Sequence, residues 1–125
     1  IRLKSSKITI MGALGKRMDH AIANIHILKD ALEANIPCQM IDEHNRIYLI
    51  NKEMTLEKEK VYGKYVSLIP LTSTVEGLSL TGFKYPLKDY TLPIGTSLGI
   101  SNEIIGDTAH IQMKNGILIV IESRD

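Results

Sequence analysis

The spacing of hydrophobic residues changes near residue 42, which divides the chain into two parts. Before this point, apolar residues recur at helical spacing at Ala21, Ile25, Leu28, Leu32 and Ile36. This period predicts an α-helix over about residues 19–34. Short apolar runs over 7–11 and 38–41 predict a strand on each side of it. A strand, a helix and a strand in this order predict a βαβ unit with parallel strands.

Beyond residue 42 no helical period remains, and short alternating runs are separated by turn residues. These runs predict strands over 46–50, 65–71, 75–80, 97–101, 109–114 and 117–123. Asn115-Gly116 predicts a hairpin between the last two. The expected fold is therefore α+β: a truncated βαβ lobe over residues 1–42, followed by an antiparallel, jelly-roll-like β-sandwich over 43–125. Residues 117–121 are apolar on both faces, which favours a homodimer that would cover them.

Composition excludes several classes of protein. The 125 residues carry 15 basic and 14 acidic side chains, and this balance argues against a nucleic-acid binder. No apolar run approaches the length of a membrane helix. Cys38, the single cysteine, cannot form an intramolecular disulfide, so the cytoplasm is the expected compartment. The chain starts at Ile1 without a signal-peptide pattern, and we expect it to be a fragment of a longer protein.

A glycine turn joins the first expected strand to the helix. Gly12 and Gly15 would let a phosphate approach the backbone amides, and Arg17 could clamp it. The match to the Walker pattern is poor. A second interpretation stays open, in which the glycines only make a tight turn and Asp19 caps the helix. Asp19 is the one carboxylate beside the turn and no histidine pair has metal-ligand spacing, so no complete metal site is predicted.

A second unusual segment is Gly95-Thr96-Ser97-Leu98-Gly99-Ile100-Ser101-Asn102-Glu103. On a strand it would place Ser97, Gly99 and Ser101 on one small, polar face. That face could receive a flat polar heterocycle, with Ser101 and Asn102 forming hydrogen bonds to it. The alternative is an ordinary solvent-facing strand that ends in an asparagine turn.

These two segments together resemble the thiamine pyrophosphokinase family. GALGKRMDHAIANIHIL is similar to the family's Gly-Ala-x-Gly-Gly-Arg-x-Asp-His turn and the helix that follows it. GTSLGISNEI, the final GILIVIESRD and the aromatic at Tyr85 also match, in the right order. Lys16 departs from the pattern, because many members have glycine there. The family's upstream Asp-rich motifs do not occur in this sequence.

The resemblance implies transfer of pyrophosphate from ATP to thiamine, giving thiamine diphosphate and AMP. It implies an ATP- and Mg²⁺-binding α/β lobe, a thiamine-binding sandwich and a dimer with the thiamine site near its interface. Asp19 and Arg17 would be catalytic, and the ATP and pyrophosphate side would consist of Gly12, Gly15, Arg17 and His20. The thiamine side would consist of Tyr85, Ser97, Ser101 and Asn102. A non-catalytic thiamine-binding or dimerisation module is the alternative, and this chain alone is expected to be nearly inactive.

Overall fold

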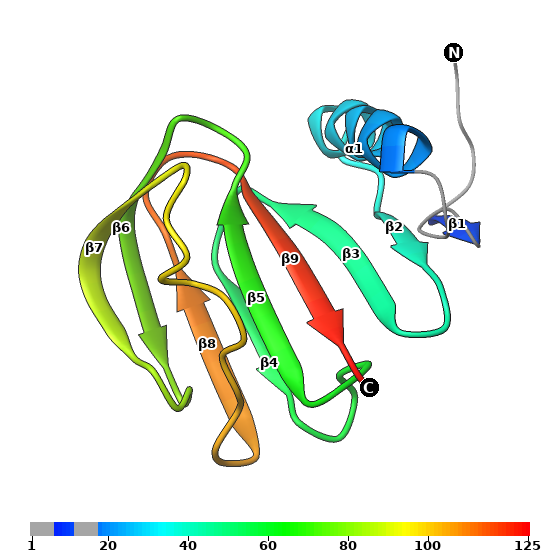
Figure 1. Ribbon diagram of the computed structural model, residues 1–125. Coiled ribbons are helices and arrows are strands. Elements are labelled where there is room, and N and C mark those ends of the chain that lie inside the picture. The colour runs from blue at the N-terminus through cyan, green and yellow to red at the C-terminus, as the bar shows by residue number, and fades with distance from the viewer. Residues whose placement is uncertain (1–6, 12–17) are drawn as a thin grey trace.

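The computed structural model describes residues 7–11 and 18–125, and this part of the chain has one helix and nine strands (Figure 1). In chain order they are β1 (Ile8–Met11), α1 (Met18–Glu33), β2 (Cys38–Ile41), β3 (Asn45–Ile50), β4 (Met54–Glu57), β5 (Tyr65–Pro70), β6 (Thr74–Thr81), β7 (Leu87–Pro93), β8 (Thr108–Gln112) and β9 (Leu118–Ser123). The element types confirm a mainly antiparallel β structure with a short helical part.

The strands form two sheets. The larger sheet has the order β1-β2-β3-β9-β5, and the smaller has the order β4-β8-β6-β7. Only β1 and β2 pair in parallel, and all other named pairs are antiparallel. The two sheets pack face to face as a sandwich, and α1 lies on the outer face of the larger sheet (Figure 1).

Strand β9 shows how alternation builds this three-layer arrangement. Leu118 and Val120 point into the core between the two sheets, whereas Ile119 and Ile121 point to the cluster under α1. Both faces of β9 are therefore covered within one chain. The expectation that this strand needs a second copy to cover it is wrong, because α1 folds back over one face and the smaller sheet covers the other. Dimerisation itself stays a prediction.

The βαβ unit is confirmed, since β1 and β2 are parallel neighbours in register and α1 connects them. The expected helix differs from α1 by one residue at each end. The larger sheet continues across residue 42, because Met40 and Ile41 of β2 pair with Ile47 and Arg46 of β3. The larger sheet is therefore not interrupted at the expected boundary between domains 1–42 and 43–125. This division into domains stays a prediction.

Two of the expected β features are wrong. Residues 97–101 form a turn rather than a strand, because Ser101 adopts a left-handed conformation with φ of 57°. Asn115-Gly116 does not form a hairpin, because β8 and β9 belong to different sheets. Local turn chemistry predicts the reversal but not the partner of the strand that follows it.

Two strands were also not expected. β4 is only four residues long, and β7 exposes most of its residues at the edge of the smaller sheet. Neither therefore carries a clear hydrophobic alternation. In the described part of the chain, no helix is long and apolar enough to cross a bilayer.

Candidate functional site

The first candidate region lies at the carboxyl edge of the two parallel strands. Met11 and Ile41 are register partners, so β1 and β2 end side by side. α1 follows β1 in the chain and leads back to the start of the parallel strand β2, so its first turn lies at this same edge. Ligands of open α/β sheets bind at the carboxyl ends of strands, so the edge suits an anionic ligand next to a helix start.

Asp19 and His20 lie in this first turn and are both exposed. The His20 backbone N–H donates to Asp19 Oδ1 at 2.9 Å. Asp19 is the second residue of α1, so the interpretation of it as the cap that precedes the helix is not supported. Gly12, Gly15 and Arg17 lie outside the described residues, and their predicted contacts with phosphate stay predictions.

The second candidate region is built around Asn102, which is only 3% exposed. Its Oδ1 accepts from the backbone N–H groups of Tyr85, at 2.9 Å, and Glu103, at 3.0 Å. Its Nδ2 donates to the Tyr85 carbonyl oxygen at 2.9 Å. The structure thus brings two of the predicted thiamine residues together, with Asn102 fixing the backbone of Tyr85.

The segment that contains Asn102 lies along β5. The backbone of Asn102 exchanges two hydrogen bonds with Val66, and the Leu68 N–H donates to the Gly99 carbonyl. A Cβ at Gly99 would lie 2.4 Å from the Leu68 carbonyl oxygen, so this close approach requires glycine. The Ser101 N–H donates to the Ser67 hydroxyl at 2.9 Å. Ser101 is therefore next to Asn102, as predicted, but on a turn rather than on a strand face.

The surface of this region is apolar in places. The Tyr85 side chain is 56% exposed, and the Lys84 ammonium lies 5.6 Å from the centre of its ring. Ser97 is exposed at the start of the turn, and its carbonyl accepts from Ile100. Three large exposed apolar residues lie within four positions of Asn102 in sequence: Leu98, Ile100 and Ile105. An aromatic face that is open to solvent suits a flat cationic ring system.

The two candidate regions lie at opposite edges of the larger sheet. β1 forms one edge, and β5, which carries the Asn102 segment, forms the other. Three strands separate them, and at about 4.8 Å per strand spacing this corresponds to roughly 20 Å. Reacting atoms must approach within about 3–3.5 Å. Within one copy of the chain, side chains from the two regions are therefore too far apart to contact the same reacting atoms.

A third polar cluster was not predicted from the sequence. Glu122 is 2% exposed, and its carboxylate accepts from the Tyr48 hydroxyl at 2.5 Å and from the Tyr62 backbone N–H at 2.8 Å. The Arg46 guanidinium lies 3.4 Å away as its counter-ion. Burial, the Glu122 charge and this hydrogen bond together raise the pKa of Tyr48 far above the usual tyrosine value.

The same cluster borders a pocket of about 380 Å³ between β2–β3 and β4. None of the residues predicted to bind ATP or thiamine lines this pocket. The signal that could have located the cluster is the charged Glu122 at the end of an apolar strand. Its register partner on β3 is Arg46, a pairing that the sequence alone does not give.

Among residues 7–11 and 18–125, no three side chains of His, Cys, Asp or Glu gather closely enough to hold a metal ion. Mg²⁺ in nucleotide sites takes one or two protein carboxylates together with phosphate oxygens. Asp19 fits this chemistry as one carboxylate at the carboxyl edge of the sheet.

Residues 52–118 match the family model described as "Thiamin pyrophosphokinase, vitamin B1 binding domain". The match covers slightly more than half of the chain. The sequence is also 39% identical over 119 residues to thiamine pyrophosphokinase of Bacillus subtilis, and the aligned region covers 94% of this chain and 55% of that protein.

Solved structures show the same similarity. A crystal structure of thiamine pyrophosphokinase from Bacillus subtilis superposes with a TM-score of 0.92 at 37% identity, covering 98% of this chain and 57% of the other. The corresponding structure from Geobacillus thermodenitrificans gives 0.87 at 34% identity, with 98% and 56% covered. The chain thus spans about half the length of the relatives that it matches.

Proposed function

This chain belongs to the thiamin pyrophosphokinase family through its vitamin B1 binding domain, and we propose on that premise that the complete natural protein transfers pyrophosphate from ATP to thiamine. The thiamine hydroxyl oxygen would attack the β-phosphorus of ATP. The bond from that phosphorus to the α–β bridging oxygen breaks, and AMP leaves. The products are thiamine diphosphate and AMP.

The observation that carries this proposal is the extent of the similarity. The 39% identity to the Bacillus subtilis protein extends over 94% of this chain, so it includes both candidate regions. The β-sandwich alone would support a thiamine-binding module. The matching βαβ unit, with Asp19 and His20 at its carboxyl edge, favours a chain that also takes part in pyrophosphate transfer.

At the nucleotide end, we propose that Arg17, His20 and the backbone at Gly12 and Gly15 bind the phosphates. Asp19 would bind Mg²⁺ as one ligand, and other carboxylates would come from a part of the complete protein outside these 125 residues. The metal supplies positive charge that stabilises the phosphate oxygens during transfer. The protein groups hold the phosphates in line with the incoming hydroxyl.

At the thiamine end, Tyr85 would stack on the cationic rings, Ser97 and Ser101 would line the pocket, and the buried Asn102 would act by holding the Tyr85 backbone. Asn102 fixes the Tyr85 backbone through two hydrogen bonds, so the point from which the ring extends is held in place. A stacked cation contributes roughly 0.5–2 kcal/mol of binding free energy.

We further propose that the protein is a homodimer in the cytoplasm. The roughly 20 Å between the two edges of the larger sheet supports this, because one copy would supply the nucleotide end and its partner the thiamine end. The exposed apolar side chains of Leu98, Ile100 and Ile105, on the segment that carries Asn102, are consistent with an interface at that edge. The free thiol of Cys38 is consistent with a reducing compartment.

Complementation between two variants tests the function and the shared site together. Made as the complete natural protein, Asp19→Asn would be nearly inactive alone, and Tyr85→Ala would lose roughly 2- to 30-fold in activity at limiting thiamine. Mixed and allowed to exchange subunits, they should recover roughly a quarter of wild-type activity, since half the dimers are mixed and each has one intact site. AMP and thiamine diphosphate are the measured products.

The outcomes separate the two parts of the proposal. If the wild-type protein forms neither product, pyrophosphate transfer is excluded and a thiamine-binding module remains. If the wild type is active but the mixture does not exceed its parents, the shared site is wrong and the activity stands. The 125-residue chain by itself is expected to form almost no product, because the family's upstream Asp-rich motifs, whose carboxylates would bind Mg²⁺, do not occur in its sequence.

A further inference from the structure

The turn between β2 and β3 is held more firmly than a short exposed turn requires. Asp42 closes it from within, because its Oδ1 accepts from the backbone N–H groups of His44, at 2.9 Å, and Asn45, at 2.7 Å. The Asp42 N–H donates to the Asn45 carbonyl at 2.9 Å. These bonds alone would define the shape of the turn.

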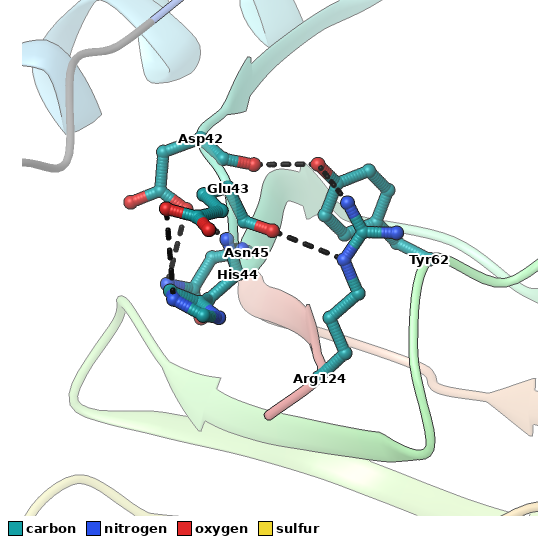
Figure 2. A network of polar contacts seen from close by, with 6 residues as sticks. All are labelled: Asp42, Glu43, His44, Asn45, Tyr62 and Arg124. Atoms are coloured by element: carbon teal, nitrogen blue, oxygen red, sulfur yellow. Dashed lines mark hydrogen bonds and ion pairs between the residues drawn. The ribbon is translucent and has the colours of Figure 1, made fainter.

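Two residues from distant parts of the chain also bind this turn from outside (Figure 2). The Tyr62 hydroxyl donates to the Asp42 carbonyl oxygen at 2.5 Å. Arg124 donates from Nε to the Glu43 carbonyl at 3.0 Å and from its backbone N–H to the His44 carbonyl at 2.9 Å. Every carbonyl of residues 42–44 is thus bound by one of these two residues.

Tyr62 and Arg124 also hold each other. Arg124 Nη2 donates to the Tyr62 hydroxyl oxygen at 3.1 Å, and the guanidinium carbon lies 4.1 Å from the centre of the tyrosine ring. The Tyr62 backbone N–H is anchored on the buried Glu122 carboxylate at 2.8 Å. We call this pair, Tyr62 and Arg124, the turn clamp. It connects the sandwich rigidly to the 42–45 turn.

The position of this turn, at the edge of the sheet where α1 begins, suggests what the clamp does. Ile41 is the register partner of Met11, so the 42–45 turn leaves the larger sheet at the carboxyl edge where α1 begins. Glu43 and His44 are exposed there, with the two side chains 3.9 Å apart. Asp19 and His20 belong to the same edge. A turn fixed at this place borders whatever binds at the start of α1.

We infer that Tyr62 and Arg124 are positioning residues for the nucleotide end of the site, acting through the 42–45 turn. The inference rests on the proposed function, because it takes the ligand at this edge to be the phosphate-bearing substrate. The clamp ties the turn to the sandwich, so the wall of the nucleotide site keeps its position without the clamp residues touching the substrate. Thiamine, held near β5, is not affected by it.

The test compares two tyrosine hydroxyls in the complete natural protein. Tyr62→Phe keeps the ring beside Arg124 and removes the hydroxyl, which bonds to the Asp42 carbonyl of the turn and to Arg124 Nη2. Its matched control is Tyr48→Phe. This change removes a hydroxyl that bonds to Glu122, the residue that also anchors the Tyr62 backbone, but that makes no bond to the turn. Arg124→Gln tests the second clamp residue. Calorimetric titration measures ATP and thiamine affinity for each variant, and thermal unfolding measures stability.

Tyr62→Phe and Arg124→Gln should each weaken ATP binding roughly 2- to 10-fold, the effect of losing one or two hydrogen bonds, and leave thiamine binding unchanged. Tyr48→Phe should lower the unfolding temperature without changing either affinity. The inference is wrong if the clamp variants bind ATP like wild type, if they weaken both ligands equally, or if Tyr48→Phe weakens ATP binding as much. If the wild-type protein binds ATP but forms no thiamine diphosphate, the proposed function is wrong. The comparison of ATP and thiamine affinities between the variants still tests the clamp.

Discussion

Asn102 and Tyr85 form a reciprocal pair, in which the side-chain amide of one residue binds both backbone polar groups of the other. The amide oxygen accepts from the Tyr85 N–H and the amide nitrogen donates to the Tyr85 carbonyl, both at 2.9 Å. Seventeen residues separate the two in sequence. The nearly buried Asn102 therefore holds the backbone from which the exposed Tyr85 ring extends.

Asn102→Ala should destabilise the protein and weaken thiamine binding together. The change leaves the Tyr85 backbone groups without partners, which costs about 1–3 kcal/mol in unfolding free energy. The Tyr85 ring then loses its fixed position. Urea denaturation and calorimetric titration with thiamine are the measurements. Asn115→Ala is the control, because Asn115 is exposed and its side chain makes only a 3.5 Å contact with Glu76. Unchanged thiamine affinity in a folded Asn102→Ala protein would remove Asn102 and Tyr85 from the pocket.

Gly99→Ala should destabilise the protein by about 1–3 kcal/mol, because the added methyl group would overlap the Leu68 carbonyl at 2.4 Å. The 99–102 segment must then move away from β5. Gly106→Ala is a matched control, since a Cβ at Gly106 meets no atom within 4 Å and should change stability by no more than about 1 kcal/mol. Chemical denaturation of both variants decides this prediction. Equal stability of the two variants would show that the close approach to β5 does not hold in solution.

Much of the fold could be predicted from the hydrophobic pattern, and the failures have a common cause. α1 and the buried strand β9 follow clear periods because each buries one or two whole faces. β7 buries little and has no such pattern. The 97–101 segment alternates like a strand, yet a left-handed Ser101 makes it a turn. Backbone conformation at single residues is not visible in hydrophobic spacing.

The alkaline stability of the protein should depend on Tyr48. Burial, the charge of Glu122 and the hydrogen bond to it raise the pKa of Tyr48 in the folded state. The folded chain therefore keeps this proton at pH values where the unfolded chain, with a tyrosine pKa of about 10, has lost it. The resulting stability is complete below the unfolded-state pKa and is lost as the pH rises above it.

Urea denaturation between about pH 8 and about pH 11 tests this, because the range includes the ordinary tyrosine pKa of about 10. The unfolding free energy of the wild type should fall more steeply with pH than that of Tyr48→Phe. Tyr90→Phe, on the exposed edge strand β7, should keep the wild-type slope. If the Tyr48→Phe and wild-type slopes are the same, the buried Tyr48–Glu122 pair is not what limits alkaline stability.

The candidate site could be predicted only in part, because some of its residues contact partners that lie far away in the sequence. Asp19 and His20 follow Gly12 and Gly15 in sequence, and Ser101 and Asn102 are adjacent, so local sequence motifs indicate them. The Tyr48–Glu122 pair spans 74 residues, and the Tyr62–Arg124 pair spans 62. Such contacts depend on strand order and register, which one sequence does not encode in a local pattern.

Asp19→Asn should reduce turnover of the complete protein by a large factor and leave it folded. Asp19 lies in the first turn of α1, where a negative charge interacts with the helix dipole by about 0.3–1 kcal/mol. Losing that amount would not unfold the domain. A metal ligand that loses its charge, in contrast, leaves the phosphate oxygens without part of their compensation, so the barrier to transfer rises.

Asp30→Asn, in the same helix and also exposed, should have near wild-type turnover. Initial rates of AMP formation, with the unfolding temperature measured in parallel, separate the two roles. Wild-type rates in Asp19→Asn would mean that Asp19 serves only the helix, and that the metal is held entirely by other residues.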